Sequence, residues 1–117
     1  MGHFTVTIVL YPRGAGPPRA LEALVDTGAS FSVVPRPILE ALGCQPIRMQ
    51  RVTLADGRTD RWPLTEVSVE CEGLRITSPV LMGPADARVL LGAITLEGLS
   101  LGVDPSGCRL VPVDDLV

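Results

Sequence analysis

The sequence predicts a mainly β domain with one or two short helices. The chain has 117 residues, of which 46% are hydrophobic but only 3% aromatic, and it contains 12 glycines and 11 prolines. Frequent glycine and proline divide a chain into short elements, which favours strands and turns over a helix bundle. The length suits a single domain over residues 1–117 with a modest core.

The N-terminal part predicts three strands and a helix. Residues 4–10 alternate apolar and polar at first and are rich in β-branched side chains, so they predict a strand. After a loop rich in proline and glycine, residues 20–26 predict a second strand that returns antiparallel to the first. Residues 31–34 predict a short third strand. Pro37 then suits the first turn of a helix over residues 38–42.

Two β-prone runs, residues 47–54 and 62–70, flank Asp56 and Gly57, which are a strong hairpin signal. Taken alone, this pair also fits an ordinary surface hairpin. The rest of the chain predicts a second hairpin (67–71 and 74–82), a strand at 88–91, a short helix at 95–99 with Thr95 as its N-cap, and two final strands (101–103 and 109–113) around a turn at 104–107.

Composition argues against several classes of partner. The net charge is −3, the pI is about 5.0, and the ten basic residues are scattered arginines, so nucleic acid is not expected. No apolar run reaches the roughly 20 residues of a membrane helix, so no membrane is expected either. The three cysteines, Cys44, Cys71 and Cys108, lack paired metal spacing. They predict reduced core thiols in a cytoplasmic protein, with no metal and no cofactor.

The most informative stretch runs from Ala23 to Ser30. It brings Asp26 from the end of an apolar run into a glycine turn, and an unpaired carboxylate is costly to bury there. The Thr27 hydroxyl can donate and accept hydrogen bonds. Gly28 can adopt backbone angles barred to other residues and brings amide N–H groups close. The alternative is a strand that ends in an ordinary surface turn with a solvated Asp26.

Three landmarks give this chain a family resemblance. Residues 24–30, Leu-Val-Asp-Thr-Gly-Ala-Ser, resemble the active-site motif of retropepsin-like aspartic proteases, the single-domain relatives of pepsin. Residues 89–92, Val-Leu-Leu-Gly, resemble that family's paired apolar-glycine segment, and residues 52–59 lie where the family carries its flap hairpin. The landmarks occur in the family's order and extend from residue 21 to residue 99. The resemblance implies a closed, orthogonal β-barrel of the acid protease type.

The resemblance also implies roles for individual residues. Asp26 would be the catalytic residue, and Thr27 would hydrogen-bond across a dimer. The active-site turn would be supported by Gly28, Ala29 and Ser30. The flap tip would consist of Ala55, Asp56 and Gly57. A hydrophobic brace beneath the turn would consist of Leu90, Leu91 and Gly92. Plain core packing is the alternative for the brace.

The chain departs from viral members of that family at two positions. Viral retropepsins place an acidic residue where this chain has Ser30, and an arginine where it has Ala93. The two form an ion pair in those enzymes, and both halves are missing here. The sequence therefore resembles the bacterial and eukaryotic retropepsin-like proteins more than the viral ones.

One Asp-Thr-Gly motif in a short chain implies a homodimer, because two carboxyl groups that share a proton are needed to activate water and protonate the leaving nitrogen. We therefore expect an aspartic endopeptidase that acts on extended peptides. The alternative function is a non-catalytic retropepsin-like module for peptide binding or dimerisation. Leu24, Ala29, the flap tip and residues 89–94 are expected to face the cleft, which predicts aliphatic rather than aromatic subsites.

Overall fold

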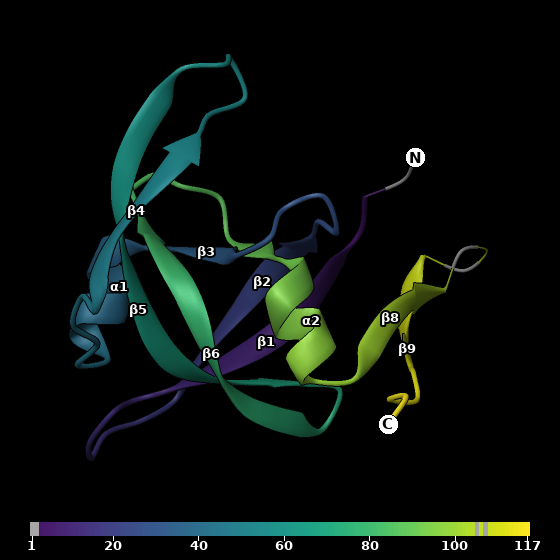
Figure 1. Ribbon diagram of the computed structural model, residues 1–117. Helices are drawn as coiled ribbons and strands as arrows, with labels where there is room; N and C mark the ends of the chain where they lie inside the picture. Colours follow the sequence, from purple (N-terminus) through teal and green to yellow (C-terminus); the bar gives the residue numbers. More distant parts are fainter. Residues whose placement is uncertain (1–2, 105, 107) are drawn as a thin grey trace.

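The computed structural model describes residues 3–104, 106 and 108–117 (Figure 1). Within these ranges the chain is mainly β and forms two short helices, as expected. Pro105 and Gly107, which belong to the turn expected at 104–107, lie outside the described residues. No helix of the described ranges combines the length and apolar character needed to span a membrane.

The elements occur in the order anticipated, with small shifts at their ends. They are β1 (Thr5–Tyr11), β2 (Arg19–Val25), β3 (Ser32–Pro35), α1 (Arg36–Ala41), β4 (Arg48–Thr53), β5 (Thr59–Cys71), β6 (Leu74–Gly83), β7 (Leu90–Leu91), α2 (Ala93–Gly98), β8 (Leu101–Asp104) and β9 (Arg109–Pro112).

The larger sheet closes on itself, which confirms the predicted closed β architecture. Its strand order is β1-β2-β7-β3-β6-β5-β4, and β1 also pairs with β5. Every strand of this sheet except β4 is therefore part of a ring. β8 and β9 pair separately as a small hairpin at the C-terminal side (Figure 1).

Strand β5 belongs both to the ring and to the hairpin that projects from it. Residues 59–64 pair with β4, residues 64–71 pair with β6, and residues 68–70 also pair with β1. Figure 1 shows the β4–β5 hairpin extending beyond the rest of the molecule. The C-terminal half of this long strand is thus held by β6, and at residues 68–70 by β1 as well, whereas residues 59–63 are held by β4 alone.

The apolar side chains form two clusters. The larger cluster fills the ring and includes Leu10, Val67, Val80 and Leu91, which are almost fully buried. The smaller cluster has Val33, Leu64 and Leu81 at its centre, with Phe31, Val52, Trp62, Ala87 and Leu90 partly buried around it. The second cluster lies where the hairpin leaves the ring, so it positions the hairpin relative to the body.

Three expectations about the C-terminal half were wrong. Helix α2 begins at Ala93 with Gly92 as its N-cap, and Thr95 is not a cap because its hydroxyl points into the core. The strand expected at 88–91 is only the pair Leu90–Leu91. Cys44 and Cys71 are buried as expected, but Cys108 is exposed because it lies in the β8–β9 hairpin, outside the core.

Candidate active site

Asp26 lies at the first residue after β2 and begins a tight turn. The Ala29 N–H donates to the Asp26 carbonyl oxygen at 3.1 Å, and the Gly28 N–H donates to Asp26 Oδ1 at 3.0 Å. The second bond orients the carboxylate, because an N–H aimed at one oxygen holds that oxygen in place. Asp26 Oδ2 has no hydrogen-bond partner among the described residues, so it is free to meet water or a second carboxyl group.

Gly28 does not serve an unusual backbone angle. Its φ does not lie in the left-handed region, contrary to the reason first given for it. A Cβ atom at this position would lie 3.3 Å from Asp26 Oδ1, which is tighter than most real contacts of a Cβ. Glycine therefore lets the backbone N–H approach the carboxylate closely.

Strand β7 supports the turn from within the sheet. It runs parallel to β2, with Leu24 opposite Leu90 and Val25 opposite Leu91, and the Asp26 N–H donates to the Leu91 carbonyl oxygen at 3.0 Å. Consecutive strand residues face opposite sides, so Leu91 is fully buried in the main core while Leu90 faces the second cluster. The residues proposed as a brace thus lie directly beside the turn.

Gly92 is the point of closest approach between this support and the turn. A Cβ atom at Gly92 would lie 2.7 Å from the backbone carbon and oxygen of Phe31 and 2.9 Å from the Ala29 carbonyl oxygen. Real Cβ atoms essentially never come this close to backbone atoms. Only glycine lets the two backbone segments cross at this distance.

The first residues of α2 hold the far end of the turn. The Ala93 N–H donates to the Ala29 carbonyl oxygen at 2.8 Å, and the Ile94 N–H donates to the Ser30 carbonyl oxygen at 2.9 Å. These N–H groups have no partner within the helix itself, because the first turn of any helix leaves its donors free. The segment at Ser30 and the start of α2 are therefore joined by backbone hydrogen bonds.

A chain of buried hydroxyl groups, Ser32–Thr95–Ser78, lies behind the turn and was not anticipated. Ser32 Oγ and Thr95 Oγ1 are 2.6 Å apart, and Thr95 Oγ1 and Ser78 Oγ are 2.8 Å apart. The Gly92 N–H donates to Ser32 Oγ at 2.9 Å, and the Ser78 hydroxyl donates to the Pro79 carbonyl oxygen at 3.1 Å.

One direction of donation along the hydroxyl chain satisfies all of these partners at once. A hydroxyl group has one proton, and that of Ser78 is used on the carbonyl oxygen of Pro79. Thr95 must therefore donate to Ser78, and Ser32 must donate to Thr95. The sequence signal that could have predicted this chain is that β3, β6 and α2 each carry a hydroxyl residue among apolar neighbours.

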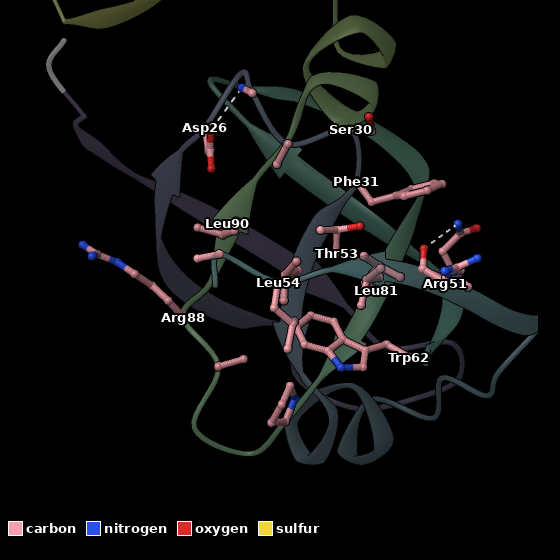
Figure 2. Close-up of a pocket in the computed structure, with 18 residues that line it drawn as sticks. Asp26, Ser30, Phe31, Arg51, Thr53, Leu54, Trp62, Leu81, Arg88 and Leu90 are labelled. Carbon is pink, nitrogen blue, oxygen red and sulfur yellow. Dashed lines mark hydrogen bonds between the residues drawn. The ribbon is translucent and has the colours of Figure 1, made fainter. Parts of the chain in front are cut away.

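A cleft of about 790 Å³ lies between the Asp26 turn and the β4–β5 hairpin (Figure 2). The turn contributes Asp26, Gly28, Ala29 and Ser30, and the hairpin contributes residues 50–55. The apolar side of the cleft, called here the cleft floor, consists of Phe31, Val33, Trp62, Leu81, Ala87 and Leu90.

The lining of the cleft differs from the aliphatic surface that was expected. The rings of Phe31 and Trp62 lie in it, and Leu24 is not among the lining residues. Phe31 follows the turn and Trp62 comes from the root of the hairpin, two segments that were not expected to face a ligand. Of the expected flap tip, Ala55 lines the cleft while Asp56 and Gly57 are exposed at its end.

The tip of the hairpin is held by its own hydrogen bonds. The Leu54 N–H donates to the Arg58 carbonyl oxygen at 2.8 Å, and Gly57 has a φ of 87°, as a three-residue loop of this kind requires. The Asp56 carboxylate accepts the Arg58 backbone N–H at 3.0 Å and the Arg58 Nε at 2.6 Å. The hydrogen bond from the Arg58 backbone N–H is the main reason that the pKa of Asp56 lies below its usual range. The hydrogen bond from the Arg58 side chain lowers this pKa further.

A smaller hollow of about 350 Å³ lies beside the same turn and includes Asp26, Thr27 and Gly28. Phe4, Val25 and Val103 supply its apolar wall, and His3 lies at its edge. The Thr27 side chain is exposed. Within the described ranges, no three His, Cys, Asp or Glu side chains are grouped so as to hold a metal ion.

Comparison with known proteins adds the following similarities. Residues 14–104 match the family model described as aspartyl protease. The solution structure of simian foamy virus (mac) protease is 21% identical with a TM-score of 0.57, and the alignment covers 80% of this chain and 92% of that one. EIAV protease complexed with the inhibitor HBY-793 is 20% identical with a TM-score of 0.61, over 82% and 86% of the two chains.

A third structure, prototype foamy virus protease-reverse transcriptase, is 17% identical with a TM-score of 0.52. The alignment covers 97% of this chain but only 12% of that one, so the likeness concerns a small part of the larger protein. No curated protein sequence matched the chain. The matched residues 14–104 include the Asp26 turn, the β4–β5 hairpin and the segment around Gly92.

Proposed function

Because the chain belongs to the aspartyl protease family, we propose that it is an aspartic endopeptidase that cleaves extended peptides as a homodimer. The observation that carries this proposal is the Asp26 carboxylate, which is oriented by the Gly28 N–H at 3.0 Å and lies at the edge of the cleft. A carboxylate with one oxygen held and the other free is suited to exchange protons with water.

The proposed mechanism uses one Asp26 from each chain. Two carboxyl groups at close range cannot both ionise, so the pair holds one proton. The ionised carboxylate removes a proton from water as the water oxygen bonds to the carbonyl carbon of the peptide. The protonated carboxyl group donates to the carbonyl oxygen. Proton transfer to the nitrogen then allows the C–N bond to break, which yields a carboxylic acid and an amine.

The smaller hollow supports assembly of two chains at this point. The exposed Thr27 lies on the Asp26 turn, and the apolar wall lies beside that turn, where a second Asp26 would have to approach. Apolar side chains near the C-terminal end are also exposed, including Val113 and Leu116. A partner chain that covers these surfaces would bring the two turns together, with Thr27 hydrogen-bonding across the two-fold axis.

We assign the β4–β5 hairpin the role of a flap. Residues 50–55 form one side of the cleft, opposite Asp26. An extended peptide between them would pair its backbone amides with the hairpin and the turn, as in other cases of strand addition. Closure of the hairpin over the peptide would exclude water from the reacting bond.

The three unpaired cysteines support a reducing location, which we propose to be the cytoplasm. Peptides or proteins are the proposed substrates, and no role for nucleic acid or membrane is proposed. The alternative function, a module that binds peptide without cleaving it, predicts the same fold and the same dimer. Turnover alone separates the two functions.

The test compares the wild type with Asp26→Asn on a mixed library of unstructured peptides. Asparagine keeps an oxygen that can accept the Gly28 N–H, so the turn should retain its geometry while the carboxylate is lost. We expect the wild type to cleave and Asp26→Asn to bind without cleaving. Sedimentation over micromolar concentrations should show a dimer for both. A wild-type dimer that binds peptides but cleaves none would favour the binding module.

A further inference from the structure

The charges that line the cleft differ from those of the protein as a whole. The chain carries a net charge of −3, yet the charged lining residues are Asp26, Arg51 and Arg88. Asp26 is assigned to the chemistry, so both charges left for substrate recognition are positive. A cleft with low-dielectric walls concentrates the field of such groups on the ligand.

Arg51 and Arg88 also lack counter-ions within the described part of the chain. Three other arginines form ion pairs there, Arg36 with Glu40, Arg58 with Asp56, and Arg109 with Asp104. Arg51 instead lies directly opposite Arg61 in the β4–β5 ladder. Like charges in opposing positions destabilise a ladder, so an added anion near the hairpin would be favourable.

Arg88 is the better placed of the two for contact with a substrate side chain. It precedes Leu90 by two residues, and Leu90 belongs to the cleft floor. Figure 2 shows Arg88 on the same side of the cleft as Asp26, with its guanidinium group extending outward from the cleft floor, so it would meet the part of a ligand that projects beyond the floor. Arg51 belongs to the opposite side of the cleft, on the hairpin, where Arg61 is its cross-strand neighbour.

We propose that Arg88 is a specificity residue, which makes the preferred substrate an extended peptide with an apolar side chain on the cleft floor and an acidic side chain beside it. This proposal rests on the proposed function only in taking the ligand to be a peptide. A guanidinium group suits a carboxylate because its N–H donors match the two oxygens. The aromatic rings of the cleft floor accept the neighbouring apolar residue.

The size of the preference follows from exposure. Arg88 is exposed, and ion pairs of exposed groups contribute modestly and are screened by salt. We therefore expect peptides with Glu at the favoured position to be about two- to fivefold better than the same peptides with Gln. The preference should shrink in 1 M salt, where the screening length falls to about 3 Å.

The experiment uses pairs of peptides that share an apolar core and differ only in Glu or Gln at each position in turn. The ratio of kcat/KM for the two members is measured for the wild type, Arg88→Gln, Arg88→Glu and the control Arg19→Glu. Arg19 is exposed at the start of β2, away from the cleft. Arg88→Glu and Arg19→Glu each change the net charge from −3 to −5, so comparison of the two excludes an effect of overall charge.

We expect the wild type and Arg19→Glu to prefer Glu at one position, Arg88→Gln to show a ratio near one, and Arg88→Glu to prefer Gln. A ratio near one at all positions in the wild type, or an unchanged preference in Arg88→Glu, would overturn the proposal. The same ratios are measured as Kd in the Asp26→Asn background. Binding needs no turnover, so a protein that cleaves nothing still tests the role of Arg88 and fails only the proposed function.

Discussion

Replacement of Thr95 with valine would remove the central hydroxyl of the Ser32–Thr95–Ser78 chain and keep the shape of the side chain. Thr95 is fully buried, and it has one bond of 2.6 Å to Ser32 and one of 2.8 Å to Ser78. The Ser32 hydroxyl would lose its acceptor. Ser78 would lose a donor but keep its own bond to the Pro79 carbonyl oxygen.

The expected cost follows from these two groups. A buried polar group left without a partner costs about 1–3 kcal/mol, and the Ser32 proton is in that position. The loss at Ser78 is smaller, because its proton remains bonded, so we expect a total of about 2–4 kcal/mol. For a domain of this size, that corresponds to a fall in Tm of about 8–16 °C, at roughly 4 °C per kcal/mol.

Thr95→Ser is the matched control, since it keeps the hydroxyl and loses only a methyl group, at about 1 kcal/mol. Both variants would be unfolded in urea at the same protein concentration, because the stability of a dimer depends on concentration. The double variant with Ser78→Ala should show coupling between the two sites. Thr95→Val as stable as Thr95→Ser, or no coupling, would refute the inference that the hydroxyl chain stabilises the fold.

Three further predictions follow from the geometry. Gly92→Ala should cost about 1–3 kcal/mol and abolish cleavage, because its Cβ would lie 2.7 Å from the Phe31 backbone, whereas Gly14→Ala meets nothing within 4 Å and should unfold like the wild type. The rate of cleavage should be bell-shaped in pH with its maximum below neutral, and a rate that rises steadily to pH 9 would contradict a carboxyl pair. Iodoacetamide at pH 8 should label exposed Cys108 in the native protein and spare Cys71, because burial raises the pKa of Cys71 to about 11. Mass spectrometry of the labelled peptides measures both reactions, and labelling of Cys71 as fast as Cys108 would contradict this prediction.

The sequence predicted the two turns at Asp26 and at Asp56–Gly57, because hydrogen bonds between neighbouring residues determine their shape. Asp56 and Gly57 predicted a hairpin because Gly57 must adopt a positive φ and Asp56 bonds to the next residues of the same turn. The Asp26 turn was located for the same reason, since the bonds that shape it join residues 26, 28 and 29.

Contacts between distant segments were much harder to anticipate. Thr95 has the residue type of an N-cap, but its hydroxyl group is hydrogen-bonded to two buried hydroxyl groups, one from β3 and one from β6. Gly28 was explained by backbone angles, although its φ is not positive and a Cβ atom there would instead lie 3.3 Å from the Asp26 carboxylate. The cleft floor includes Trp62 because β5 passes beside the Asp26 turn, and that arrangement depends on the pairing order of the whole sheet.

Because β5 belongs both to the ring and to the β4–β5 hairpin, the hairpin is anchored to the body at one end only. Residues 64–71 are clamped against β6, while residues 59–63 pair with β4 alone. Bending of residues 59–63 together with β4 would therefore change the width of the cleft without breaking a hydrogen bond of the ring. Pro63 lies at the root and has no N–H to offer a ladder, so stiffness there depends on side-chain packing. The packing of Val33, Leu64 and Leu81 would therefore determine how stiffly the hairpin resists bending.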